Sequence, residues 1–389
     1  MVTPLWEPAR WNANRVAIIG AGLAGTATAE ALTDLGIQCT LFDPAPASGA
    51  SGNAQGMLYV APQVDPTPAS RFWLQAYEYA LVQYQHSPHF HPTGLLTLAE
   101  SEQDADRLAR VLTQLNKPAE QVHWVNAEQA SQLLGRAVTQ PGLNWPQSGW
   151  MAVKDHVSRP MTSVDHQAVA VHSLTLDSDQ AWVNGQSFDL AILCNAYAAK
   201  RWLPDYLKPR PVRGQISRIQ NQEAKQAVCA EGYLTPADAQ GYASFGASFV
   251  PNDDQTDLRP DDDAFNQSLM RQLFGQALQG QAGQSRASIR CASPDYLPMV
   301  GSLPVHGLWE QALAKLRVDA KWTPSERPHQ WQRLMVNIGH GSRGLTSTPL
   351  AAAMLGQEIT GQAAPCDADL LAHLSPARFL IRALKRGQR

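Results

Sequence analysis

Cysteine is scarce in this sequence, and its spacing excludes two common ways of stabilising a fold. Five cysteines are spread over 389 residues, and none belongs to a Cys-x-x-Cys pair. An odd number at such wide spacing argues against a disulfide framework and against a zinc site. We therefore expect a protein of a reducing compartment, the cytoplasm.

Strong charge and long apolar runs are also missing. The formal net charge is -3, so a nucleic acid could be held only by a local basic patch. No uninterrupted apolar run reaches the roughly 18 residues of a spanning helix, which predicts no contact with a membrane. His86, His89 and His91 lie in a loop without a carboxylate at ligand spacing, so no metal is expected. The absence of Gly-x-Ser-x-Gly and His-Glu-x-x-His motifs leaves hydrolase chemistry without support.

Apolar residues make up 44% of the chain, enough for the core of one large or two interleaved α/β domains. The chain opens with an apolar strand over residues 15–20, a small-residue helix over 22–35 and a second strand over 37–43. This order predicts a β-α-β unit. Near the other end, a strand over 334–338, a glycine-rich turn over 339–344 and a helix over 345–355 predict another strand-loop-helix module.

Between these modules the pattern predicts mainly strands. Helical periodicity covers residues 70–85, 102–115 and 261–278. The expected strands cover 94–99, 122–125, 188–194, 212–219, 232–234, 242–249 and 285–289. Residues 309–330 indicate a polar, irregular insertion.

The strongest motif is the glycine-rich turn Gly20-Ala21-Gly22-Leu23-Ala24-Gly25, which lies between the first strand and the first helix. Gly20 permits a tight turn, Gly22 lets backbone N–H groups approach a pyrophosphate, and Gly25 allows close packing of helix and strand. Asp43 ends the next strand 18 residues beyond Gly25, where a carboxylate can accept ribose hydroxyls. This pattern predicts a dinucleotide site, but it does not separate NAD from FAD.

A second loop begins directly after Asp43. It reads Ser48-Gly49-Ala50-Ser51-Gly52-Asn53-Ala54-Gln55-Gly56 and is rich in N–H and hydroxyl donors suited to a pyrophosphate and a flavin edge. An ordinary surface loop is the alternative interpretation.

Further motifs resemble the D-amino-acid oxidase and glycine oxidase superfamily. They are Arg213-Gly214-Gln215, Arg290 and Asp295-Tyr296-Leu297-Pro298-Met299-Val300-Gly301. One branch, the FAD domain of the MnmC family of bifunctional tRNA 5-methylaminomethyl-2-thiouridine biosynthesis proteins, is resembled more closely. Its motifs here are the loop at 49–56, Gly232-Tyr233-Leu234-Thr235-Pro236, Arg290-Cys291-Ala292 and Gly341-Ser342-Arg343-Gly344-Leu345. The resemblance extends from about Arg15 to the C-terminus.

This resemblance implies an α/β fold in which an FAD-binding Rossmann-type domain, similar to that of D-amino-acid oxidase, is interleaved with a mixed β-sheet substrate domain. We expect residues 15–62, 150–212 and 285–389 in the FAD-binding domain. Residues 63–149 and 213–284 would form the substrate domain, and 1–14 an N-terminal extension.

The resemblance also implies that FAD is the cofactor. Asn195 and Ala196 are expected beside it because they follow an apolar strand, and ligands bind beyond the carboxyl ends of such strands. The full set of expected cofactor-binding residues is Gly20, Ala21, Gly22, Leu23, Ala24, Gly25, Asp43, Ser51, Asn53, Gln55, Gly56, Met57, Asn195, Ala196, Gly341, Ser342, Gly344 and Leu345.

The activity implied by the resemblance is FAD-dependent removal of the carboxymethyl group from 5-carboxymethylaminomethyl(-2-thio)uridine at the tRNA wobble position, which gives 5-aminomethyluridine and glyoxylate. Arg290 is the expected bidentate partner of the substrate carboxylate, with a structural salt bridge as its alternative role. Tyr233 would offer a hydroxyl to the substrate, unless it is simply packed. Arg343 would contact either substrate or phosphate.

Two basic stretches are candidates for binding tRNA. The first contains Lys200, Arg201, Lys208, Arg210 and Arg213 with Trp202 and Tyr206, and the second is the tail with Arg378, Arg382, Lys385, Arg386 and Arg389. Solvated charge, or a favourable helix-end dipole in the tail, is the alternative for each. Because only 14 residues precede the first strand, we expect either a separate tRNA methyltransferase to complete the modification or the chain to be a fragment.

Two other functions stay open at this point. An oxidase of free glycine, sarcosine or a D-amino acid would share the FAD loop and Arg290 but would need no basic surface. A non-catalytic nucleotide-binding or tRNA-binding protein would bind its ligand without reducing a flavin.

Overall fold

The N-terminal β-α-β unit forms as predicted in the computed structural model. Strand β1 (Arg15–Ile19) pairs in parallel with β2 (Gln38–Phe42), and helix α1 (Leu23–Asp34) connects them. Helix α1 stops where Gly36 adopts a φ of 80°, a left-handed conformation that favours glycine. Four of the five residues of β1 are buried, which explains the apolar run in the sequence.

The structure describes residues 4–220, 223–363 and 365–387, and the chain divides into two compact units. Unit 1 comprises Met1–Ser48, Val157–Arg210 and Arg290–Arg389, and unit 2 comprises Gly49–His156 and Pro211–Ile289. The expected domain limits differ because they put residues 49–62, 150–156, 211–212 and 285–289 with the dinucleotide fold. That functional division stays a prediction.

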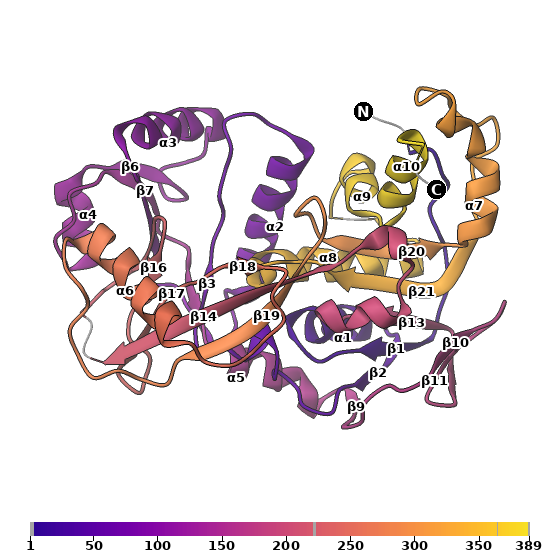
Figure 1. Ribbon diagram of the computed structural model, residues 1–389, viewed down its shortest axis with the longest axis horizontal. Coiled ribbons are helices and arrows are strands. Elements are labelled where there is room, and N and C mark those ends of the chain that lie inside the picture. Colours follow the sequence, from indigo (N-terminus) through magenta and orange to yellow (C-terminus); the bar gives the residue numbers. More distant parts are fainter. Residues whose placement is uncertain (1–3, 221–222, 364, 388–389) are drawn as a thin grey trace. The chain divides into compact units, whose positions relative to one another are not determined.

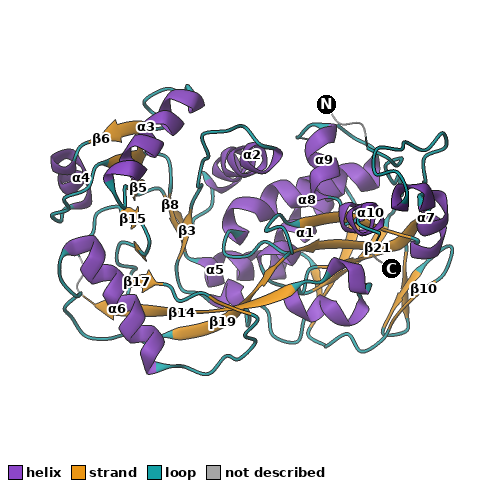
Figure 2. Ribbon diagram, turned by 45° about the horizontal axis from the view of Figure 1, so that its top comes forward, coloured by secondary structure: helices purple, strands orange, loops and turns teal. Residues whose placement is uncertain are grey.

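The main sheet of unit 1 has the strand order β20-β21-β13-β1-β2-β9. Strands β9 (Asp165–Gln167), β13 (Leu190–Leu193) and β21 (Trp331–Ile338) join the sheet in parallel, whereas β20 (Met299–Pro304) is antiparallel to β21. Helices α1 and α8 (Gly344–Thr360) pack against each other and against β21 (Figure 2). The predicted C-terminal strand-loop-helix module is therefore present.

Short elements complete the first part of unit 1. Helix α5 (Val153–Ser158) begins in the last residues of the first segment of unit 2 and ends in unit 1, where the turn η2 (Arg159–Thr162) follows. A small antiparallel sheet contains β10 (Leu174–Leu176), β11 (Ala181–Val183) and β12 (Gln186–Phe188). After β13 come the turns η3 (Ala196–Trp202) and η4 (Asp205–Leu207).

The expectation of an irregular insertion at residues 309–330 is wrong in its first part. Helix α7 (His306–Ala312) and the turn η5 (Ala314–Arg317) lie there. Helices α9 (Ala368–Leu374) and α10 (Ala377–Lys385) come later in the chain, after α8. Trp309 is fully buried, donates from Nε1 to the Gln330 carbonyl at 2.7 Å, and contacts the rings of Trp6 and Trp331. Apolar residues that are far apart in the sequence thus form a local core, which the polar character of residues 309–330 did not indicate.

Unit 2 is built on a sheet with the order β18-β14-β17-β16-β15-β5-β7-β6. Strand β19 pairs with β14, and Figure 1 shows these two strands side by side. The strands are β5 (Leu95–Leu98), β6 (His123–Val125), β7 (Gly142–Trp145), β14 (Arg210–Gln220), β15 (Ala227–Cys229), β16 (Tyr233–Leu234), β17 (Tyr242–Gly246), β18 (Val250–Pro251) and β19 (Arg286–Ala292). The part of β19 from Arg290 onward belongs to unit 1. A smaller sheet joins β3 (Gly56–Leu58), β8 (Gly149–Met151) and β4 (Phe90–His91).

The helices of unit 2 are α2 (Pro68–Tyr84), α3 (Glu102–Leu115), α4 (Ala127–Leu134) and α6 (Pro260–Phe274), with the single turn η1 (Ala50–Gly52) near its start. Helix α6 is shorter than predicted because Gly275 caps it at a φ of 72°. None of the described helices has both the length and the apolar character needed to cross a membrane.

Candidate active site

The glycine turn of unit 1 has no room for side chains at two of its positions. Gly20 has a φ of 106°, and a Cβ added there would lie 2.7 Å from the Asn195 backbone. A Cβ on Gly25 would lie 1.7 Å from the Gly20 carbonyl oxygen. Gly22 is the N-cap of α1 and provides no side-chain cap, so the positive end of the helix can face an anionic ligand.

Asp43 fixes this turn to the end of β2. Its Oδ2 accepts the Ala21 N–H at 2.7 Å, and its Oδ1 accepts the Ala45 N–H at 2.8 Å. Each carboxylate oxygen retains a further lone pair, and the residue is only partly buried. Contact between Asp43 and a ribose stays a prediction that this geometry permits.

Asn195 and Ala196 follow β13 and lie beside the turn, as the Asn195 contact at Gly20 shows. Asn195 Oδ1 is buried and has no hydrogen-bond partner in the protein. Such an acceptor costs about 1–3 kcal/mol if nothing satisfies it. A cradle closed to side chains and an unpaired buried acceptor together fit an extended dinucleotide such as FAD.

The loop at residues 339–345 reaches the same region of unit 1. A Cβ on Gly344 would lie 3.3 Å from the Leu23 side chain at the start of α1, and Gly341 has a φ of 58°. Ser342 is exposed, whereas Leu345 is buried in the first turn of α8. The expected cofactor residues of this loop therefore lie next to those of the glycine turn.

Arg290 and Arg343 are carried by segments of unit 1 that are joined through their backbones. The Gly341 N–H donates to the Cys291 carbonyl at 2.8 Å, and Cys291 directly follows Arg290. Arg343 precedes α8 as its N-cap residue. Both arginine side chains are partly buried, and their catalytic roles stay predictions.

The loop after Ser48 belongs to unit 2, where Arg286 holds it at two points. The Arg286 guanidinium donates to Asn53 Oδ1 at 3.1 Å and to the Gly49 carbonyl at 2.7 Å. These two contacts bracket η1, which contains Ser51. The Asn53 side-chain oxygen therefore binds the protein itself.

Gln55 is 1% exposed, and both the nitrogen and the oxygen of its side-chain amide form hydrogen bonds within the protein. Its Nε2 donates to the Pro236 carbonyl at 2.8 Å, and its Oε1 accepts hydroxyls from Thr235 at 3.0 Å and Ser244 at 2.9 Å. We expected Asn53 and Gln55 to bind the cofactor directly. Their side chains instead hold the loop, and any cofactor contact by these residues stays a prediction.

The other expected residues of unit 2 lie on strands of two different sheets. Gly56 and Met57 belong to β3, where Met57 is opposite Trp150 of β8. Tyr233 lies on β16 and pairs with Gly246 of β17. Tyr233 is partly buried, three residues before Pro236, whose carbonyl accepts the bond from Gln55.

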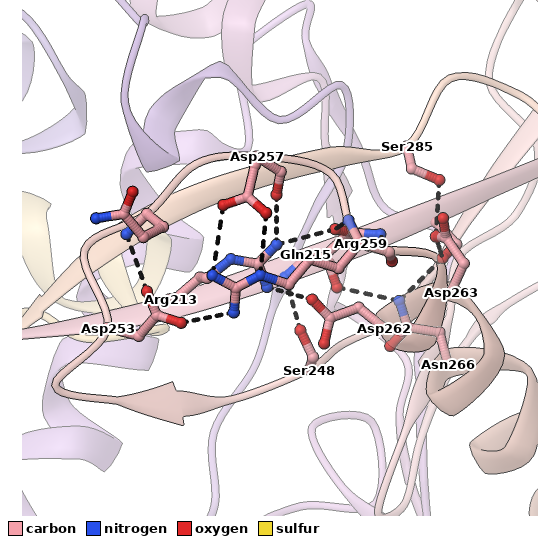
Figure 3. A network of polar contacts seen from close by, with 12 residues as sticks. Arg213, Gln215, Ser248, Asp253, Asp257, Arg259, Asp262, Asp263, Asn266 and Ser285 are labelled. Carbon is pink, nitrogen blue, oxygen red and sulfur yellow. Dashed lines mark hydrogen bonds and ion pairs between the residues drawn. The ribbon is translucent and has the colours of Figure 1, made fainter.

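Arg213 is not part of a basic surface, contrary to prediction. Its side chain is fully buried, forms an ion pair with Asp262, and donates to the Asp257 carbonyl at 2.6 Å and to Gln215 at 3.1 Å. Figure 3 shows this guanidinium enclosed by a polar network that also contains Arg259. Arg213 is therefore a structural residue of unit 2 and cannot contact RNA.

The basic tail needs a similar correction. The Arg378 side chain is 5% exposed and bonds Asp295 through two nitrogens at 3.0 and 2.9 Å, and Arg382 pairs with the same carboxylate. Burial alone would raise the pKa of Asp295, but the two guanidinium groups hold that pKa well below its usual range. Arg378 therefore joins the tail to Asp295. Lys385 and Arg386 remain exposed, and Arg389 lies outside the described residues.

The first basic stretch keeps four exposed cations: Lys200, Arg201, Lys208 and Arg210. The Arg201 guanidinium lies 4.4 Å from the centre of the Trp202 ring, and Lys200 lies 5.6 Å from that of Tyr197. We call these four residues the η3–η4 basic surface. Cations interleaved with aromatic rings are typical of nucleic-acid contacts.

Sequence reasoning missed Arg286 and His340. Arg286 lies four residues before Arg290 on β19, and the alternation of side chains along a strand was the available signal for it. His340 stood within the predicted glycine loop without an assigned role. Among the described residues, no group of three or more His, Cys, Asp and Glu side chains is arranged to hold a metal.

The sequence matches the family model described as FAD dependent oxidoreductase over residues 15–358. It is 35% identical to the tRNA 5-methylaminomethyl-2-thiouridine biosynthesis bifunctional protein MnmC of Chromohalobacter salexigens, over 99% of this chain and 59% of that protein. The corresponding protein of Methylobacillus flagellatus is 33% identical over 96% of this chain and 60% of its own length. The chain thus spans about three fifths of the curated relatives it matches.

Solved structures share the fold. Glycine oxidase from Geobacillus kaustophilus superimposes with a TM-score of 0.72 at 21% identity, covering 95% of this chain and 99% of that one. Iminodiacetate oxidase from Chelativorans sp. BNC1 gives 0.71 at 20% identity, with 93% and 99% covered. These likenesses confirm the fold class expected from the sequence.

Proposed function

The chain belongs to the FAD-dependent oxidoreductase family, and from this premise we propose that it removes the carboxymethyl group from 5-carboxymethylaminomethyl(-2-thio)uridine at the tRNA wobble position. The observation that carries the proposal is the match of nearly the whole chain to proteins named for tRNA 5-methylaminomethyl-2-thiouridine biosynthesis. The family match confirms the predictions that FAD is the cofactor and that the chain is an oxidoreductase.

The proposed reaction breaks one C–N bond. The substituent R–NH–CH2–COO⁻ loses two electrons and two protons to give R–N=CH–COO⁻, and water then yields R–NH2 and glyoxylate. FAD, when bound, supplies the two-electron acceptor. The residues that would hold FAD are the glycine turn with Asp43, Asn195 with Ala196, the loop at 341–345 and the segment from Ser51 to Met57.

The chain's own contribution is to bind and orient the substituent. Arg290 is proposed to bind the carboxylate through two hydrogen bonds, which fixes the methylene carbon at the position where its hydrogen is lost. Arg343 would place a second positive charge close to the substrate carboxylate or would contact a phosphate. Tyr233 would offer its hydroxyl to the amine. A carboxylate clamp suits this substrate because it ends in a glycine-like acid.

The tRNA partner is supported by the η3–η4 basic surface. Its four cations are exposed, and Trp202 and Tyr197 lie beneath two of them. Because the chain spans about three fifths of its relatives, methylation of the resulting amine is proposed to need a separate tRNA methyltransferase activity or a further part of a longer chain.

The purified protein with FAD and tRNA carrying carboxymethylaminomethyluridine provides the test. Nucleoside mass spectrometry should show conversion to aminomethyluridine, with glyoxylate released in equal amount. Arg290→Ala should lower kcat/KM by a factor of roughly 10² or more while FAD stays bound, since the lost partner is the carboxylate. Unchanged turnover in that variant would show that the clamp is elsewhere.

The same assay separates the competing substrates. Turnover of glycine, sarcosine or a D-amino acid with no change in the tRNA would replace the proposal with a free-amine oxidase. FAD binding without reduction by any of these substrates would indicate a non-catalytic protein.

A further inference from the structure

A chain of hydrogen bonds crosses the interior of unit 1 through the ring of His340. His340 Nδ1 lies 2.8 Å from the Ser347 hydroxyl, and Nε2 lies 2.9 Å from Asn337 Oδ1. Asn337 Nδ2 donates to the Thr28 hydroxyl at 3.0 Å, which in turn donates to the Ala24 carbonyl at 2.7 Å. The ring therefore connects α8 with β21 and with the first turns of α1.

The direction of each hydrogen bond follows from the groups present. Asn337 Oδ1 only accepts, so His340 Nε2 carries a hydrogen and donates. The single hydrogen of the Ser347 hydroxyl has two acceptors within reach, Nδ1 of the neutral ring at 2.8 Å and the Arg343 carbonyl at 2.9 Å. Burial lowers the pKa of His340 to about 4, which keeps the ring neutral at physiological pH. Neither ring contact therefore requires a charge on His340.

The backbone of His340 belongs to the loop that joins the two candidate substrate arginines. The Arg343 N–H donates to the His340 carbonyl at 3.1 Å, and the adjacent Gly341 N–H donates to the carbonyl of Cys291, next to Arg290. The ring is therefore fixed to the helix that follows the glycine turn, while the backbone is fixed to the segments that carry both guanidinium groups.

We propose that His340 is a positioning residue that sets the loop at 339–345, and with it Arg290 and Arg343, in a fixed relation to the start of α1. His340 needs no contact with the substrate for this role. The consequence is that carboxylate binding depends on a ring that bridges α1 and α8. This inference rests on the proposed role of the two arginines as partners of the substrate carboxylate.

Three variants separate this role from general destabilisation. His340→Ala removes both ring contacts. Ser347→Ala removes the hydroxyl beside Nδ1, together with the hydrogen bond of that hydroxyl to the Arg343 carbonyl, and leaves the contact of Nε2 with Asn337. Thr348→Val is the matched control, because the Thr348 hydroxyl donates to the Gly344 carbonyl at 2.8 Å in the same turn of α8 and Thr348 has the same burial as Ser347 within 1%. His340→Gln keeps an amide that can donate to Asn337.

Two readouts are needed, and one of them uses no cofactor. Hydrogen–deuterium exchange of the apoprotein should show faster exchange at residues 339–345 in His340→Ala and Ser347→Ala, with Thr348→Val like wild type. In the FAD-loaded protein, the Kd of glycolate, followed by its effect on flavin absorbance, should rise at least tenfold in His340→Ala and less in Ser347→Ala. His340→Gln should recover part of the loss.

Equal exchange of this loop in wild type and in Ser347→Ala, which is the milder change, would overturn the inference. Equal loss of glycolate binding in Thr348→Val would overturn it as well, because the effect would then belong to α8 in general. Failure of the proposed function is distinguishable, because the exchange experiment uses the apoprotein and does not depend on activity toward tRNA. A protein that is inactive on tRNA but exchanges faster at residues 339–345 in His340→Ala would contradict the proposed function and not the positioning role of His340.

Discussion

Glu358 is an acidic side chain held inside unit 1 by neutral groups. Its Oε1 accepts the Ser302 N–H at 3.1 Å, and the Ser302 hydroxyl accepts the Trp11 indole N–H at 2.8 Å. The neighbouring Gly301 has a φ of 116°, and a Cβ there would lie 2.8 Å from Glu358 Oε2. Burial raises the pKa of Glu358 to about 7, so the folded protein favours its protonated form.

This shift predicts a pH-dependent stability. A raised carboxyl pKa means that the folded state binds more protons than the unfolded state, so stability is complete below pH 4.5 and falls as pH rises toward 7. Between pH 5.5 and pH 8 the loss amounts to up to about 2 kcal/mol. Glu358→Gln cannot titrate and should therefore gain up to about this amount relative to wild type over the same interval.

Urea unfolding of both proteins at pH 5.5 and pH 8 measures this difference. The exposed Glu326→Gln controls for the general loss of one negative charge. A difference between Glu358→Gln and wild type that stays constant with pH would contradict the prediction.

At the scale of elements, the loop after Ser48 is shaped by contacts from β19, from β17 and from the residues that directly follow β16. Arg286 brackets η1, and two residues beyond Asn53 the Gln55 amide joins the loop to Thr235 and Ser244. The Thr235 hydroxyl also accepts the Ser244 N–H at 2.9 Å. The described hydrogen bonds of Gln55 thus hold the loop against residues 235–236, which directly follow the strand of Tyr233, and against β17.

Gln55→Glu should therefore weaken FAD binding by roughly tenfold or more, because a buried carboxylate would face the Pro236 carbonyl without a hydrogen to donate. Titration of the apoprotein with FAD, followed by flavin fluorescence, gives the Kd. Gln83→Glu, on the exposed side of α2, makes the same chemical change without burial. Wild-type affinity in Gln55→Glu would show that the loop does not need this anchor.

Local patterns predicted several elements of this fold closely. The helix expected over residues 102–115 is α3, whose N-cap Ser101 accepts the Asp104 N–H at 3.1 Å. In the β-α-β unit, the glycines on either side of the helix mark where that helix begins and ends. Partners distant in sequence could not be predicted in this way. Trp309 is buried by Trp6 and Trp331, and Gln55 is bonded by residues 180 and 189 positions away.

The same limit applied to charge. Arg213 and Arg378 belong to basic runs of sequence, yet each is buried against an aspartate that lies 49 or 83 positions away. A run of cations indicates a surface only if no acidic group from another element neutralises it. For this reason the candidate RNA-binding surface contains fewer cations than the sequence indicated.

At the scale of the whole molecule, a net charge of -3 cannot attract a polyanion, so tRNA binding must depend on where the cations are placed. The η3–η4 basic surface is a part of unit 1 in which four exposed cations and two aromatic rings occur together. If it contacts phosphates, each cation removed should lower the slope of log K against log salt by about 0.7–0.9.

The double variant Lys200→Ala with Arg201→Ala should therefore weaken tRNA binding and reduce that slope by about 1.5, without changing FAD affinity. Filter binding of tRNA at several salt concentrations measures both quantities. The control removes two exposed arginines of unit 2, Arg110→Ala with Arg271→Ala, and so changes the net charge equally. If this control reduces the slope as much as the first variant does, tRNA binding follows net charge rather than the η3–η4 basic surface.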